Sequence, residues 1–95
     1  MTGIDVRCRP AGDAWSCTVQ LRDRGRDVSS HEVQVSATTF ARLDPGAPDP
    51  AELVRRSFTF LLDREPASSI LRSFDLDVIG RYFPEYESII GGREH

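Results

Sequence analysis

Apolar and polar residues alternate strictly in two segments near the N-terminus, residues 4–9 and residues 15–22. This period of two predicts a pair of half-buried β-strands, and the turn-forming residues at positions 10–13 predict a hairpin between them. A two-residue turn at positions 12 and 13 puts apolar residues opposite one another: Cys8 faces Cys17, Val6 faces Val19 and Ile4 faces Leu21. Because a slip of one residue would set apolar side chains against polar ones, the pattern favours this register.

A third alternating segment follows a polar turn at residues 23–27. Its apolar face would carry His31, Val33, Val35 and Ala37, and its polar face Glu32, Gln34 and Ser36. The three segments together predict a three-stranded antiparallel β-meander with one apolar face and one polar face.

The helical part of the chain has its strongest start signal at Asp49, which can cap a helix with Pro50 at its first position and Glu52 completing a capping box. This helix should extend to about Arg64, because Pro66 disfavours helical geometry at the residue before it. Its apolar residues span about 200° of the helical wheel, which is wider than the stripe that faces a single sheet. The pattern therefore predicts one long amphipathic helix that is covered on more than one side.

Shorter apolar patterns predict two or three short helical pieces after the long helix, and one before it. The preceding helix, capped by Thr38 or Thr39, would carry Phe40 and Leu43. The later pieces are a helix with the apolar face Ile70, Leu71 and Phe74, a helix capped by Asp75 over residues 76–83, and a last turn at residues 85–90.

The predicted fold class is α+β, in which the meander is followed by the long helix and the short helices. With 95 residues the chain is long enough for one domain and too short for two. We expect a sheet over about residues 4–37, a helical part over about residues 38–90 and a disordered tail at residues 91–95.

Composition predicts a cellular location and argues against membranes and nucleic acids as partners. No apolar run approaches the roughly 20 residues that span a bilayer, and residues 1–9 lack a signal-peptide pattern. We therefore expect a soluble cytoplasmic protein that does not bind membranes. All twelve basic residues are arginine, yet the net charge is −3, which is not the balance of a strongly basic nucleic-acid binder.

The segment around residues 50–87 contains the sequences FLLDREP, SIL and RYFPEY. In these it resembles a family of small uncharacterised prokaryotic proteins. The resemblance implies a short β-rich start followed by a helical block, and it implies no activity, ligand or site residue.

Cys8, Cys17 and His31 are the residues closest to a metal-binding set, because the predicted register brings the two thiols together beside the third strand. No CxxC or HxxxH spacing supports a metal, and small thiols also pack well on an apolar sheet face. We expect two reduced cysteines and no bound metal or other cofactor, with reversible thiol oxidation as a further possibility.

Signatures of catalysis are missing from the sequence. There is no phosphate-binding glycine loop, no nucleophile elbow and no second internal histidine beside His31. A chain of this length also has little room for a deep pocket. An enzyme is therefore the third of three functional hypotheses.

Nucleic-acid association is the second hypothesis. The outer sheet face would carry several arginines that could follow a phosphate backbone, but it has no aromatic residue to stack on bases, and carboxylates dilute the charge. The arginines and carboxylates concerned are Arg7, Arg9, Arg22, Arg24, Arg26, Asp5, Asp23, Asp27 and Glu32.

The leading hypothesis is a non-catalytic protein-interaction or regulatory module. A small domain has difficulty hiding all of its C-terminal aromatic residues, and those left exposed would form an interaction surface with arginines at its rim. The candidate residues are Phe74, Tyr82, Phe83, Tyr86, Arg72 and Arg81. The partner would be another protein or a second copy of the chain, and pairing along an exposed strand edge is the competing route to a dimer.

Overall fold

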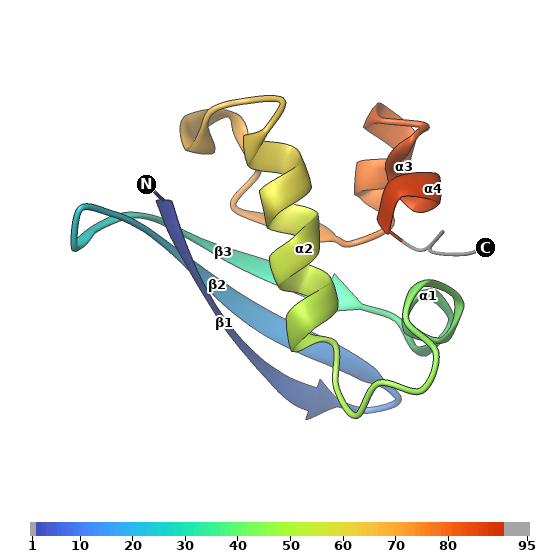
Figure 1. Ribbon diagram of the computed structural model, residues 1–95. Helices are drawn as coiled ribbons and strands as arrows, with labels where there is room; N and C mark the ends of the chain where they lie inside the picture. Colours follow the sequence, from blue (N-terminus) through green and yellow to red (C-terminus); the bar gives the residue numbers. More distant parts are fainter. Residues whose placement is uncertain (1, 91–95) are drawn as a thin grey trace.

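A computed structural model describes residues 2–90, in which a four-stranded sheet is packed against helices (Figure 1). The strand order is β1-β2-β3-β4. Three ten-residue strands, β1 (Thr2–Ala11), β2 (Ala14–Asp23) and β3 (Arg26–Val35), pair antiparallel as predicted. The fourth, β4 (Ser73–Asp75), pairs parallel to β3.

The predicted register of the first hairpin is confirmed. Cys8 pairs with Cys17, Val6 with Val19 and Ile4 with Leu21. The turn begins at Gly12, whose φ of 69° suits a type II′ turn, in which glycine takes the first central position.

The expectation of two reduced cysteines is wrong, because a disulfide joins Cys8 to Cys17. The two residues are directly opposite each other, and their Cα atoms are 4.0 Å apart. Side chains of such a cross-strand pair come close enough to bond. The register had placed the thiols together correctly, and the error came from assigning a reducing compartment. Disulfides are typical of oxidising compartments, so the cytoplasmic location stays a prediction.

The long amphipathic helix is also a wrong prediction. The helix α2 (Ala51–Leu62) has twelve residues, and its N-cap is Pro50. Asp49 stands one position earlier, where its carboxylate accepts from the Ala51 N–H at 2.9 Å. Glu52 forms an ion pair with Arg55 at 3.3 Å instead of completing a capping box. The last helical turn tightens, since the Arg64 N–H donates to the carbonyl three residues earlier, Leu61 O, at 2.9 Å.

A further correction concerns residues 70–75, where an apolar helix was predicted. A short 3₁₀ helix, η1 (Ala67–Ser69), is followed by extended chain that becomes β4. Phe74 pairs with Val33 and lies on the inner face of the sheet, where its ring centroid is 6.1 Å from that of Phe58. The extended conformation wins because it completes backbone hydrogen bonds along β3: Glu32 N–H donates to Arg72 O at 2.7 Å, and Leu76 N–H donates to Gln34 O at 2.9 Å.

The remaining helices are α1 (Ala37–Leu43), α3 (Val78–Tyr82) and α4 (Tyr86–Ile90). Two predicted caps are displaced. Ser36, not Thr38 or Thr39, caps α1 through its hydroxyl, which accepts from the Thr39 N–H at 3.1 Å. The N-cap of α3 is Asp77, not Asp75.

One face of the sheet carries the core. In Figure 1, α2 crosses this face, and α1, α3 and α4 lie beside it toward one end of the sheet. Three inner residues of β2 (Cys17, Val19 and Leu21) and two of β3 (Val33 and Val35) are fully buried, whereas Trp15 is half-buried. The core consists chiefly of these five residues and of Leu53, Val54, Phe58, Leu61, Leu76, Ile79 and Tyr86. Along β1 and β3, more buried and more exposed side chains alternate, as the period of two in the sequence predicts.

Among residues 2–90, no helix is both long enough and apolar enough to cross a bilayer. The predicted disordered tail, residues 91–95, lies outside the described residues.

Candidate interaction site

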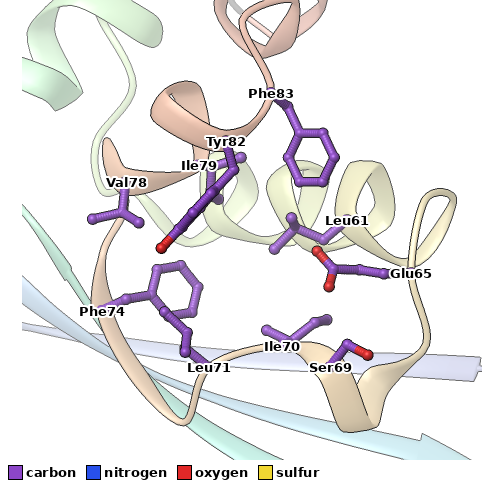
Figure 2. A pocket seen from close by; sticks show the side chains of 10 residues that line it. All are labelled: Leu61, Glu65, Ser69, Ile70, Leu71, Phe74, Val78, Ile79, Tyr82 and Phe83. Carbon is purple, nitrogen blue, oxygen red and sulfur yellow. The ribbon is translucent and has the colours of Figure 1, made fainter.

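A pocket of about 450 Å³ opens between the C-terminal end of α2, η1, β4 and α3. Figure 2 shows side chains from these four elements arranged around one space. Its lining is mostly apolar and consists of Leu61, Glu65, Ser69, Ile70, Leu71, Phe74, Val78, Ile79, Tyr82 and Phe83. The volume lies within the range of about 300–1,000 Å³ that is usual for ligand sites.

The pocket forms because two turns separate α3 from α2. After α2, the extended residue Pro66 precedes η1, and the chain then returns to the sheet as β4. Phe74 and Ile79 then anchor the two flanks, since their side chains are buried in the core.

Two apolar side chains stand at the mouth of the pocket. Tyr82 is 69% exposed and Leu71 is 52% exposed. Large apolar side chains gathered at a hollow mark binding sites more often than the same side chains scattered over a surface.

Glu65 is the one charged residue in the lining. Its side chain is half-buried, and Figure 2 shows its carboxylate turned toward Leu61 and Ile70. Within residues 2–90, the neighbouring cation Arg64 is engaged elsewhere, with Glu85 at 3.3 Å and over the Phe60 ring at 3.7 Å. A cationic group entering the pocket would therefore meet a carboxylate that has no competing ion pair in the described part of the chain.

The predicted aromatic surface divides between core and pocket. Tyr82 and the half-buried Phe83 line the pocket, as does the inner edge of Phe74, which is 9% exposed. Tyr86 is completely buried, so its inclusion in an interaction surface is not supported by its position. Arg72 and Arg81 are exposed, but neither lines the pocket.

Tyr86 instead belongs to a buried polar pair with Ser57. Its hydroxyl is 2.6 Å from the Ser57 hydroxyl, and both residues are fully buried. Burial raises the pKa of Tyr86 to about 12. The phenol is therefore a structural group that stays neutral.

The cysteine–histidine set is not available as a thiolate site, because the disulfide uses both sulfur atoms. His31 is 2% exposed, and both of its ring nitrogens have partners. Nδ1 lies 2.7 Å from Leu71 O and Nε2 lies 2.9 Å from the Ser29 hydroxyl. Within residues 2–90, no three histidine, cysteine or acidic side chains gather as metal ligands.

The polar face of the sheet carries a shallow groove of about 200 Å³, lined by Asp5, Arg7, Thr18, Gln20 and Arg22. Arg22 is paired with Asp27 at 3.2 Å, and Thr18 donates to Glu32 at 2.7 Å. Carboxylates thus stand among the arginines here, which weakens attraction for a phosphate backbone.

The predicted interaction surface contained three of the ten residues that line the pocket, Phe74, Tyr82 and Phe83, and lacked the other seven. Leu61 was assigned to the apolar arc of the long helix, Ile70, Leu71, Val78 and Ile79 to apolar faces of short helices, and Glu65 and Ser69 were given no role. The apolar arc of about 200° was the available signal, because it indicated that α2 needed cover beyond the sheet.

No protein-family model, no curated protein and no solved structure matches the chain, and the resemblance of residues 50–87 to a family of small prokaryotic proteins therefore stays a prediction.

Proposed function

We propose that the protein is a non-catalytic interaction module that binds a protein segment in the pocket between α2 and α3. The observation that carries the proposal is the apolar pocket of about 450 Å³ with Tyr82 and Leu71 exposed at its mouth. Exposing these side chains to water is unfavourable, and a partner's apolar side chain would remove them from it at about 25 cal/mol per Å² of buried apolar surface.

The partner's chemistry follows from the charges around the pocket. Residues 63–87 hold six carboxylates and three arginines, a balance of −3. Two of the carboxylates, Glu85 and Glu87, are already paired with arginines, whereas Glu65 faces the pocket. A segment with one or two large apolar residues next to a lysine or arginine fits this combination.

Docking of an apolar anchor with a neighbouring cation requires no chemistry from the site. The pocket supplies a carboxylate, the Ser69 hydroxyl and the Tyr82 hydroxyl, but no histidine or cysteine. This lining is suited to recognition by burial and one ion pair.

Selection from a displayed library of random peptides tests the proposal. Peptides selected on the wild-type protein should share a large apolar residue near a lysine or arginine. Leu71→Glu and Tyr82→Ala should weaken their binding at least about tenfold, since hot-spot truncations typically cost more than 1 kcal/mol. Glu65→Gln should weaken chiefly the peptides that carry the cation.

Val28→Glu is the matched control, because Val28 is 51% exposed on β3 and does not line the pocket. It should bind the selected peptides as the wild type does. Failure to select any peptide, or selection of peptides that ignore the Leu71 and Tyr82 variants, would contradict the proposal. Binding of small apolar molecules alone would assign the pocket to a different class of ligand.

A further inference from the structure

The free edge of the sheet is β1, and its outward backbone groups belong to its even-numbered residues. Ala11 and Ala14 flank the two-residue turn, a position that exchanges hydrogen bonds across a hairpin. Pairs then alternate, so Ile4, Val6 and Cys8 do not exchange backbone hydrogen bonds with β2 and point their N–H and C=O groups outward. Pro10 agrees with this, because a proline is tolerated where its nitrogen faces away from the neighbouring strand.

The side chains between these outward groups carry opposite charges. Asp5 and Arg7 are exposed on the polar face, and the ion pairs formed within residues 2–90 involve other side chains. An edge with opposite charges two residues apart is complementary to an antiparallel copy of itself, provided that the register is centred between them.

We propose that β1 pairs antiparallel with β1 of a second copy of the chain, about a twofold axis at Val6. In this register Asp5 of each copy faces Arg7 of the other, which gives two equivalent ion pairs. Val6 faces itself, and Ile4 faces Cys8 of the second copy, so that these facing even-numbered residues can exchange outward hydrogen bonds. The result is one continuous sheet of eight strands across the two copies.

The charges select this register from the others that satisfy the backbone. A twofold axis at Asp5 would set Asp5 against itself. An axis at Arg7 would set Asp5 opposite Arg9 twice but would also set Arg7 against itself, whereas the axis at Val6 gives two ion pairs and no facing like charges. An axis at Cys8 would bring Arg7 against Arg9, and an axis at Ile4 would set Asp5 opposite Gly3 without an ion pair. Like charges directly opposite destabilise a strand pair, so the axis at Val6 is favoured.

The dimer must accommodate Arg55, because this side chain already contacts the outer edge of β1. Its guanidinium donates to Ile4 O at the edge, and it also pairs with Glu52 on its own helix. A carbonyl has two lone pairs, so Ile4 O can accept from Arg55 and from the second copy together. Alternatively, Arg55 keeps its Glu52 contact and releases the carbonyl.

A charge-exchange experiment tests the interface on the intact chain. Sedimentation equilibrium over micromolar to millimolar concentrations should show a monomer–dimer equilibrium for the wild type. Asp5→Arg and Arg7→Asp should each weaken it at least about tenfold, because each sets like charges opposite one another twice. The double variant, which carries both changes, should regain dimerisation.

Mixing the two single variants is the decisive measurement. An Asp5→Arg chain carries two cations and an Arg7→Asp chain two anions, so a heterodimer should form from two partners that do not self-associate. Amide exchange at Val6 and Cys8 should slow in every dimer. The pocket variant Leu71→Glu should dimerise normally, which separates this interface from the proposed partner site.

Three outcomes would overturn the proposal: a wild type that stays monomeric up to millimolar concentration, single variants that dimerise like the wild type, or a dimer that Leu71→Glu abolishes. Because Asp5 and Arg7 are exposed, their substitution should leave the fold intact. The thermal unfolding midpoints of the variants check this.

Discussion

The hydroxyl of Tyr86 donates a hydrogen bond to the hydroxyl of Ser57, 2.6 Å away in the core. The direction follows from the next bond, because the Ser57 hydroxyl gives its single hydrogen to Leu53 O at 2.8 Å. The pair ties α4 to the middle of α2 and fixes the position of the C-terminal helix over the core.

Removing either hydroxyl should therefore have unequal effects on stability. Tyr86→Phe removes a donor and leaves Ser57 bonded to Leu53 O, so the free energy of unfolding should fall by about 1 kcal/mol. Ser57→Ala leaves a buried phenol without an acceptor and should cost about 1–3 kcal/mol. Denaturant unfolding of both variants and of the double variant measures the difference. Equal losses, or a larger loss for Tyr86→Phe, would contradict the assigned direction.

The raised pKa of Tyr86 predicts a loss of stability at high pH. In the unfolded chain the phenol ionises near its ordinary value of 10.0, whereas in the folded protein it ionises near about 12. The stabilisation is complete below pH 10 and is lost as the pH rises toward 12, because the unfolded state releases its proton first. The loss over this interval should be about 3 kcal/mol. Unfolding measured across this range should show a shallower decline for Tyr86→Phe, and Tyr82→Phe should behave as the wild type does.

Reduction of the disulfide should lower the stability of the protein, while β1 and β2 keep the same pairing. Cys8 and Cys17 are separated by nine positions, and closing so short a loop contributes about 2–3 kcal/mol. The thermal midpoint should fall by roughly 10–20 °C on addition of a thiol reductant. The protein purified without reductant should be lighter than the reduced chain by two hydrogen atoms. A Cys8→Val, Cys17→Val variant is the control, because its midpoint should not respond to reductant. An unchanged wild-type midpoint would contradict the prediction.

His31 on β3 should hold the segment that leads into β4, because its ring is hydrogen-bonded to the carbonyl of Leu71, 40 positions later in the chain. Because Leu71 O can only accept, Nδ1 of His31 donates to it, and in the neutral ring Nε2 accepts from Ser29. His31→Phe keeps a ring beside Phe58 but removes the donor. Hydrogen exchange at the Glu32 and Leu76 amides, which bridge β3 and the β4 segment, should accelerate more than exchange within the first hairpin.

Ser29→Ala serves as the control for this prediction, because it removes only the Nε2 partner. Its effect on the two amides should be small. A uniform acceleration of exchange throughout the sheet in His31→Phe would show general destabilisation instead of a local tie.

The alternation of residues in the first third of the chain was enough to predict three strands, their antiparallel pairing and the register of Cys8 with Cys17. Each of these depends on contacts between residues close together in sequence, and a period of two allows one register for an apolar face. The same register brought the two sulfur atoms together. Whether they bond was not in the pattern, because it depends on the redox environment.

Tertiary structure decided the rest, because it depends on contacts between distant segments. Phe74 has apolar neighbours at helical spacing, yet it is extended, since backbone hydrogen bonds to β3 and contact with Phe58 outweigh the local preference. Tyr86 is buried and Tyr82 is exposed, although both are aromatic and four residues apart. The pocket has no sequence signature, because Leu61, Glu65, Leu71 and Tyr82 meet only when α2, the turn at η1, β4 and α3 have packed on the sheet.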